Sequence, residues 1–313
     1  MTPTIVVGVD GGGTKTRVLV ADESGKTFAD VSGPASAVKP GHAEHSAQVI
    51  AETVAMALEE AELEHVIPKV LCVGVAGVGR EHERQALWQA LAAREIAEEV
   101  LVHADATVAL DDAFGDGAGV LLIAGTGSVA FGRGPTGTVA RCGGWGPVIG
   151  DEGSGAWIGR RALSVVTAAA DGREPETALA GAVLTAAQVN DVTELIAWAA
   201  SATPAMLATL APAVMSEAES GDLRANALLS LAVEELMLHV RSLARQLFVD
   251  ERASLPVALT GGLLRRGQPL RKRLEQRLKS AVPGAAVQPG DVDAARGAVR
   301  GALRFLGGNA IGV

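Results

Sequence analysis

The chain has 313 residues, more than one hydrophobic core usually supports, so two domains are expected. With 48% hydrophobic and 20% charged residues, its composition is that of a globular protein and excludes a disordered or fibrous chain. The net charge of -9 argues against nucleic acid or an anionic membrane as the main partner, because both require basic surface.

The cysteines and the beginning of the chain bear on the compartment. Cys72 and Cys142 are too few and too far apart for a disulfide framework or a set of metal ligands, so a reducing compartment, the cytoplasm, is expected. The first residues enter an apolar strand without a basic region or cleavage site, and no apolar run has the length of a membrane span. We predict no signal peptide and no membrane anchor.

The first part of the chain is predicted to form a three-stranded meander followed by alternating helices and strands. The pattern predicts strands at residues 5–10, 18–20, 27–31, 70–75 and 100–105, and helices at 44–63, 80–94 and 107–113.

The same order then begins again. The pattern predicts strands at residues 119–124, 129–132, 138–142, 257–260 and around 287, helices at 154–170, 268–279 and 293–306, and an almost wholly helical stretch at 173–247. Each part thus begins with a meander that has a glycine turn after its first strand. This predicts an α/β fold built from an internal repeat; two unrelated α/β domains with similar turns are the alternative.

A glycine-rich loop follows the first predicted strand. Asp10 ends the strand, and the loop continues with Gly11, Gly12, Gly13, Thr14 and Lys15. Backbone N–H groups of such a loop can approach phosphate oxygens closely, which makes it a candidate ATP-binding element. Thr stands where a P-loop requires Lys, so a P-loop NTPase is disfavoured. An ordinary hairpin turn is the alternative interpretation.

Two further glycine turns are candidate nucleotide contacts. The turn that contains Thr126 and Gly127 has the equivalent position in the second part, so the two loops could clamp a polyphosphate across a cleft between domains. Gly261 and Gly262 end a later strand and would allow a base or ribose to lie against the backbone. Taken alone, the turn at Gly261 and Gly262 is compatible with any strand-to-helix connection.

Asp105 is the candidate catalytic residue. It closes a predicted buried strand, where its carboxylate would face the cleft, and it lies between the two phosphate loops in the sequence. A helix N-cap for the segment that begins at Thr107 is the alternative.

Residues 142–154 carry the densest motif of the chain. Gly144 and Gly146 bring backbone donors to a ligand, Trp145 supplies a flat apolar wall, and Asp151 and Glu152 can accept hydrogen bonds from hydroxyl groups. This combination is typical of sugar binding. A structural turn in which Asp151 or Ser154 caps the next helix is the alternative.

These motifs, in this order, resemble those of N-acetylglucosamine kinases of the BadF/BadG/BcrA/BcrD-type ATPase family. That family is part of the superfamily of hexokinase, actin and the heat-shock ATPases. The resemblance extends from Gly8 to about Gly308, and its most specific part is Gly-Gly-Trp-Gly at 143–146 followed by Gly-Asp-Glu-Gly at 150–153.

The resemblance implies a role for each matching residue. Asp105 would be the general base, Thr14 and Thr126 would contact phosphate, and Gly261 and Gly262 would lie near the nucleoside. Gly144, Trp145, Gly146 and Asp151 would bind the sugar. Asp10 would hold Mg²⁺ through water. ATP and Mg²⁺ are thus the expected cofactors.

The resemblance also implies two duplicated ribonuclease H-like (actin-like ATPase) domains around an interdomain cleft. We expect residues 1–114 to form the first and 115–293 the second, with a helical insertion at about 172–247 and a final helix, 294–307, that packs on the first. Homodimers are expected. In one departure, the segment 33–37 has Ala where the related kinase has an Asn that touches the sugar. Ser36 is the candidate replacement, and a different sugar substrate is the alternative.

The resulting prediction is an ATP-dependent kinase that phosphorylates an amino sugar, N-acetylglucosamine or a related hexosamine, at the 6-hydroxyl. One alternative is an activator ATPase of a 2-hydroxyacyl-CoA dehydratase or benzoyl-CoA reductase system, which would need an iron–sulfur cluster and usually four cysteines. Another is a sugar-binding regulator without catalysis, although the sequence shows no DNA-reading module. Arg265 and Arg266, with the arginines at 271–277, are expected to form a basic helix face that is most simply solvated, although one of them could approach phosphate.

Overall fold

The computed structural model describes residues 3–248 and 254–308, which divide into two compact units. Unit 1 consists of residues 1–116 and 292–313, and unit 2 of residues 117–291. Within the described residues, no helix combines the length and the apolar character needed to cross a membrane. Each unit is built around one five-stranded sheet.

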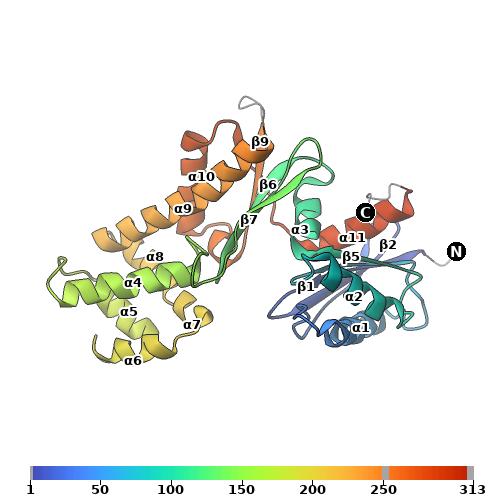
Figure 1. Cartoon of the computed structure of the whole chain (residues 1–313), viewed down its shortest axis with the longest axis horizontal. Coiled ribbons are helices and arrows are strands. Elements are labelled where there is room, and N and C mark those ends of the chain that lie inside the picture. Colours follow the sequence, from blue (N-terminus) through green and yellow to red (C-terminus); the bar gives the residue numbers. More distant parts are fainter. Residues whose placement is uncertain (1–2, 249–253, 309–313) are drawn as a thin grey trace. The chain divides into compact units, whose positions relative to one another are not determined.

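The sheet of unit 1 has the strand order β3-β2-β1-β4-β5 (Figure 1). β1, β2 and β3 form an antiparallel meander, whereas β4 and β5 run parallel to β1. Their bounds are Ile5–Gly11, Thr16–Asp22, Thr27–Gly33, Val70–Val75 and Glu99–Ala104. Because β1, β4 and β5 are parallel, their carboxyl ends meet at the same edge of the sheet.

Helices cover both faces of this sheet (Figure 1). The helices are α1 (Ala43–Glu60), α2 (Glu81–Ala92), α3 (Asp105–Phe114) and α11 (Ala294–Leu306). Alternate residues of a strand point to opposite faces, so Val7 and Val9 pack with α1 and α2 while Val6 packs with α3 and α11. Both faces are therefore buried, which explains the near-continuous apolar runs of β1 and β4.

The helix α11 lies unusually close to the sheet because of Gly8 in β1. A Cβ at this position would lie 2.5 Å from the Val299 nitrogen and 2.6 Å from the Ala295 carbonyl oxygen. Gly297 of α11 likewise has no room for a Cβ beside the Val108 carbonyl of α3. Glycines thus allow the last helix to pack backbone against backbone on the first part of the chain.

The sheet of unit 2 has the order β10-β9-β6-β7-β8. Its strands are β6 (Gly119–Ala124), β7 (Ser128–Arg133), β8 (Val139–Gly143), β9 (Leu255–Thr260) and β10 (Ala285–Val287). β6, β7 and β8 form an antiparallel meander, and β9 runs parallel to β6 and to β10.

Among the described residues of unit 2, six helices, α4 to α9, form most of the connection between β8 and β9, and η1 and α10 follow β9. They are α4 (Gly155–Ala170), α5 (Leu179–Ala187), α6 (Glu194–Ser201), α7 (Pro204–Ala208), α8 (Ala211–Glu219), α9 (Leu223–Leu247), the 3-10 turn η1 (Gly262–Leu264) and α10 (Pro269–Ala281). One hydrophobic core joins these helices to β6, β7 and β9.

The two sheets have the same topology. Counted within its own unit, each sheet has the order 3-2-1-4-5, with an antiparallel meander followed by two parallel strands. The prediction of an α/β fold with a repeated unit is therefore confirmed.

Two details of the sequence interpretation were wrong. Asp105 is the first residue of α3 and does not end β5. The face at 271–277 is not simply solvated: Arg271 is 4% exposed and donates to the Leu264 carbonyl, and Arg273 donates to Asn226 of α9.

Candidate active site

The glycine loop of unit 1 connects β1 to β2 at the carboxyl edge of the sheet. The Gly12 N–H donates to the Lys15 carbonyl over 2.9 Å, which closes the turn, while Gly13, Thr14 and Lys15 are exposed. Gly11 is buried, and its carbonyl accepts from the Ala76 N–H. A loop with a fixed base and an exposed tip fits the approach of a phosphate group.

Ser36 supports this loop from below. Its hydroxyl accepts a 2.7 Å hydrogen bond from the Thr16 hydroxyl, and its N–H donates to the Gly12 carbonyl. A Cβ on Gly11 would lie 2.6 Å from the Ser36 oxygen, and Ser36 itself is 1% exposed. Ser36 would have to be uncovered before it could contact a sugar, so its geometry fits a supporting role.

Asp10 lies at the end of β1, beside Gly74 of β4. Burial, together with smaller contributions from the negative charges of Asp105 and Asp293, raises the pKa of its carboxyl group to about 6. Lys15 and Arg17 act in the opposite direction. Asp10 and Asp105 are thus close enough to influence each other, as expected for residues at the carboxyl ends of β1 and β5, two parallel strands with only β4 between them.

Asp105 is placed by the direct passage of β5 into α3. Its carboxylate accepts a 2.8 Å hydrogen bond from the Ala106 N–H, at the amino end of α3. Burial raises the pKa of Asp105, and backbone N–H groups oppose the rise. The N-cap position belongs to Ala104, so the alternative in which Asp105 is only a helix cap does not describe this geometry.

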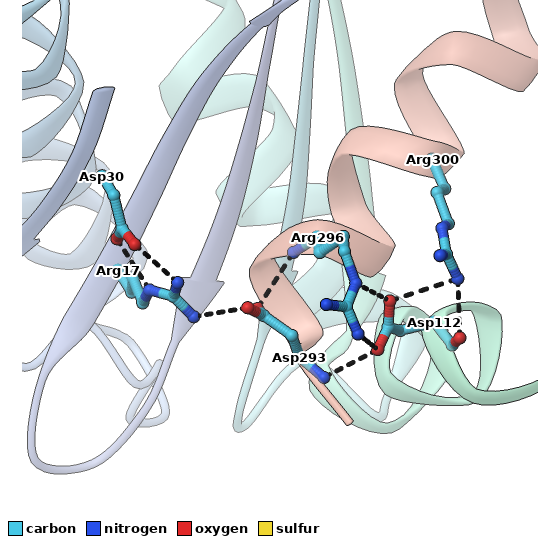
Figure 2. A network of polar contacts seen from close by, with 6 residues as sticks. All are labelled: Arg17, Asp30, Asp112, Asp293, Arg296 and Arg300. Atoms are coloured by element: carbon cyan, nitrogen blue, oxygen red, sulfur yellow. Dashed lines mark hydrogen bonds and ion pairs between the residues drawn. The ribbon is translucent and has the colours of Figure 1, made fainter. Parts of the chain in front are cut away.

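Asp293 is a residue of the site that the sequence interpretation did not select. It caps α11 by accepting from the Arg296 N–H, and it accepts a 2.7 Å hydrogen bond from Arg17 of β2 (Figure 2). Arg17 is held in turn by both oxygens of Asp30. An Asp directly before an amphipathic helix is an N-cap signal, but its position near Asp10 depends on the fold of the whole unit.

In unit 2, the turn after β6 is joined to the first residues of α4 and to the segment just before them. The Gly155 N–H donates to the Gly125 carbonyl over 2.8 Å, and the Ala156 N–H donates to the Thr126 carbonyl over 3.1 Å. The Ser128 hydroxyl donates to the Glu152 carbonyl over 2.7 Å. Two motifs that are about 25 residues apart in the sequence therefore form one structure.

Asp151 is at the centre of this structure. Its carboxylate accepts from the Gly146 N–H over 3.2 Å, and a Cβ on Gly127 would lie 2.7 Å from its Oδ2 atom. Its φ of 58° lies in the left-handed region, which a non-glycine residue adopts at some cost. The other described non-glycine residues with positive φ follow helix ends, whereas Asp151 lies between two motif glycines.

The turn at Gly261 and Gly262 belongs to the same cluster. Gly261 has a φ of 98°, and a Cβ there would collide with the Ala124 carbonyl oxygen at the end of β6. Gly262 begins η1, and the Gly261 carbonyl accepts from the Leu264 N–H. The three glycine motifs of unit 2 thus meet where β6 and β9 end, at the carboxyl edge of the second sheet.

Trp145 and Glu152 lie at the margins of this cluster. Trp145 is 66% exposed, with the Arg141 guanidinium 5.0 Å from the ring centroid. The Glu152 carboxylate lies 4.0 Å from Nε2 of the buried His239 in α9. Ser154 caps α4 by accepting from the Trp157 N–H, as the structural alternative for this segment expects. The side chain of Trp145 remains accessible to a ligand.

Asp10 fits the chemistry of a magnesium site. Within the described residues, no group of three or more His, Cys, Asp or Glu side chains forms a protein-only metal site. Mg²⁺ commonly binds through one or two carboxylates together with water and substrate phosphates. A half-buried carboxylate beside an exposed phosphate-loop tip is compatible with that mode.

The family model described as "BadF/BadG/BcrA/BcrD ATPase family" matches residues 7–303. This chain belongs to that family. Among its relatives, the N-acetyl-D-glucosamine kinase of Dictyostelium discoideum is 31% identical over 97% of this chain and 99% of the relative. The N-acetylmuramic acid/N-acetylglucosamine kinase of Clostridium acetobutylicum is 29% identical over 83% of this chain and 85% of the relative.

The likeness extends to the fold of the BadF/BadG/BcrA/BcrD ATPase family. A solved structure from Chromobacterium violaceum, assigned to the N-acetylglucosamine kinases, is 34% identical to this chain with a TM-score of 0.77. It covers 96% of this chain, which in turn covers 99% of it. The predicted resemblance to N-acetylglucosamine kinases of this ATPase family is confirmed.

The cysteines do not favour the activator alternative within the same family. Cys72 is fully buried in β4 of unit 1, where burial raises the pKa of its thiol to about 12. An iron–sulfur cluster is held by thiolates, so a thiol that resists ionisation is a poor ligand. Cys142 belongs to β8 of unit 2.

Proposed function

We propose that this chain transfers the γ-phosphoryl group of ATP to a hydroxyl of an amino sugar, N-acetylglucosamine or a related hexosamine. The observation that supports the chemistry most directly is Asp105, a half-buried carboxylate at the carboxyl edge of the first sheet with a raised pKa. The names of the relatives support the choice of an amino sugar as the acceptor. The 6-hydroxyl is the proposed acceptor oxygen.

Asp105 acts as the general base. Its carboxylate takes the proton of the sugar hydroxyl as that oxygen forms a bond to the γ-phosphorus and the bond to the β-phosphate oxygen breaks. A base with a pKa above the usual range of Asp combines a usable deprotonated fraction with a stronger pull on the proton. General base catalysis of this kind contributes about 10² to 10⁴-fold to the rate.

The remaining acceleration comes from positioning and from neutralisation of phosphoryl charge. Backbone N–H groups of residues 13–14 and 126–127, with the Thr14 and Thr126 hydroxyls, hold the phosphates. The N–H groups of Gly12 and Gly125 instead donate within their own turns, to the Lys15 and Gly127 carbonyls. Asp10 would hold Mg²⁺ through water, and the ion, when bound, would neutralise negative charge on the phosphates of ATP. Gly261 and Gly262 lie against the nucleoside.

Unit 2 supplies the sugar contacts in this proposal. Asp151 and Glu152 accept hydrogen bonds from hydroxyls, the backbone at Gly144 and Gly146 contributes polar groups, and Trp145 covers an apolar part of the sugar. A homodimer and a cytoplasmic location remain predictions.

An ADP-release assay on the whole chain tests the proposal. Glucosamine, N-acetylglucosamine, N-acetylmuramic acid and glucose are compared with a reaction without sugar, in the presence of Mg²⁺ and ATP. An amino sugar should raise ADP release well above the background, and NMR of the product then identifies the phosphorylated oxygen. Equal ADP release with and without every sugar would contradict a sugar kinase.

A further inference from the structure

The last turns of α9 carry two arginines, Arg241 and Arg245, that form no ion pair within the described part of the chain. Arg241 and Arg245 are four positions apart, so their side chains share one face of the helix. Across residues 3–248 and 254–308, neither guanidinium forms a hydrogen bond or an ion pair with an acidic group. Glu234, the carboxylate on which Arg241 acts electrostatically, is held by Arg277 of α10.

Both arginines line one open pocket between α9 and β8. The pocket has a volume of about 440 Å³, and its other polar walls are Cys142 of β8 with His239, Ser242 and Gln246 of α9. None of the described residues that line it is acidic. By contrast, the pocket beside α10 pairs Arg271 with Glu275 at 2.7 Å. The α9 pocket is therefore locally basic on a chain of net charge -9.

We propose that the α9 pocket binds a phosphate monoester dianion. Guanidinium groups bind phosphate oxygens through paired N–H donors, and two of them on one helix face can hold one dianion. Ser242 supplies a hydroxyl donor and Gln246 an amide donor, and the Gln246 amide already lies 3.1 Å from the Ser242 oxygen. The volume admits a ligand as large as a hexose phosphate.

The pocket adjoins the motif segment at 143–153. His239 is buried between the two: its Nδ1 atom lies 2.7 Å from the Glu235 carbonyl, and a Cβ on Gly143 would collide with its Nε2 atom. Cys142, in the wall of the pocket, directly precedes Gly143. A bound anion would therefore lie beside the start of the predicted sugar segment, so an effect on sugar KM is expected if the proposed function holds.

Cys142 provides a probe of this site that does not depend on enzyme activity. The chain has two cysteines, and Cys72 is fully buried with its thiol pKa raised to about 12, so it should not react. Alkylation of the native protein by iodoacetamide should label Cys142. Inorganic phosphate or glucose 6-phosphate in the pocket should slow that labelling.

The decisive comparison uses the variant Arg241→Gln/Arg245→Gln, which keeps polar side chains of similar length. It should need an about tenfold or higher concentration of phosphate for the same protection, because two charge-assisted hydrogen bonds are lost. The control Lys272→Ala/Lys279→Ala removes the same charge from exposed positions of α10 and should behave as the wild type. Equal thermal unfolding midpoints would verify that the variants are folded.

The outcomes separate the sources of the phosphate group. Protection by glucose 6-phosphate at lower concentration than inorganic phosphate identifies a sugar phosphate as the better ligand, and equal protection identifies the phosphate group itself. The proposal is overturned if neither ligand protects Cys142 beyond a chloride solution of equal ionic strength. It is also overturned if the arginine variant keeps full protection, or if the lysine control loses it.

Discussion

The two units share a sheet topology but equip the carboxyl edge of the sheet differently. In unit 1 this edge carries Asp10 and Asp105, two carboxylates whose pKa values are raised by burial. In unit 2 the corresponding edge carries three glycine motifs that are joined by backbone hydrogen bonds. The two units therefore share a scaffold, whereas the loops that follow their strands place different chemical groups at the two edges.

This contrast is tested most strongly by Asp105→Asn. The change removes the proposed base but keeps the size of the side chain and a carbonyl oxygen that can accept from the Ala106 N–H. We expect kcat to fall by about 10² to 10⁴-fold while the affinity for a non-hydrolysable ATP analogue, measured by calorimetry, stays within a few-fold. The wild-type rate should fall in acid as Asp105 is protonated, at a pH above the usual pKa of Asp because its pKa is raised.

Asp116→Asn is the matched control for this variant. The Asp116 side chain is 77% exposed, and its partner Arg304 keeps Asp111 as a second partner, so the replacement should leave kcat unchanged. A near-normal kcat for the Asp105 variant would remove Asp105 from the chemistry and would leave both edges as binding surfaces.

Asp10→Asn tests how much the buried negative charge of Asp10 destabilises unit 1. A rise in the Asp10 pKa from 3.8 to about 6 means that the folded state disfavours the charged carboxylate by about 3 kcal/mol at neutral pH. Without Mg²⁺ and nucleotide, the variant should therefore be more stable than the wild type at pH 7. Its advantage should shrink as the pH falls through about 6 and should vanish below about 4, where both states bind the proton.

Urea unfolding at several pH values measures this difference, and activity should collapse in the same variant. A variant that is less stable at pH 7, or an advantage that persists at pH 3, would show that burial does not penalise the Asp10 charge.

The prediction from sequence was most accurate where hydrophobicity alone sets a boundary. Residues 70–75 and 119–124 are buried runs between polar or glycine positions, and β4 and β6 have these bounds. Asp105 was assigned to the wrong element because β5 passes into α3 without a loop, a boundary that depends on hydrogen bonds. The prediction for 271–277 failed at Arg271, because that side chain finds backbone acceptors that no sequence pattern reveals.

The site shows the same limit. Glycine spacing identified each loop, but Ser36 was selected for its type and proved to be buried against Thr16. The pair of Arg17 and Asp293 joins residues 276 positions apart, so only the folded unit brings it beside Asp10. A local sequence motif therefore predicts the type of loop, whereas charged pairs between residues far apart in the sequence depend on tertiary packing.

Asp112→Ala tests how unit 1 holds its last helix. The Asp112 side chain is 1% exposed and accepts from both Arg296 and the Asp293 N–H, and the Arg300 guanidinium lies 3.2 Å from it (Figure 2). We expect a loss of about 2 kcal/mol in unfolding free energy, less than for a fully buried pair because the arginines are half exposed. Hydrogen exchange should show the loss in α11 and β1.

The exposed Asp116, whose partner Arg304 also pairs with Asp111, again supplies the control. Asp116→Ala should change the unfolding free energy by less than about 0.5 kcal/mol. If the two variants lose the same stability, the contacts of Asp112 do not anchor α11.

Trp145→Ala has the smallest expected effect and tests the unit 2 edge alone. Because the ring is 66% exposed and contacts Arg141, its removal should change the unfolding free energy little. If Trp145 covers the sugar, KM for the sugar should rise about tenfold while kcat changes less, since stacking binds ground and transition states alike. Val148→Ala, at an 85% exposed position of the same segment, should leave KM unchanged. An equal KM for both variants would locate sugar recognition in Asp151 and the backbone of the glycine turns, and would make that edge wholly polar.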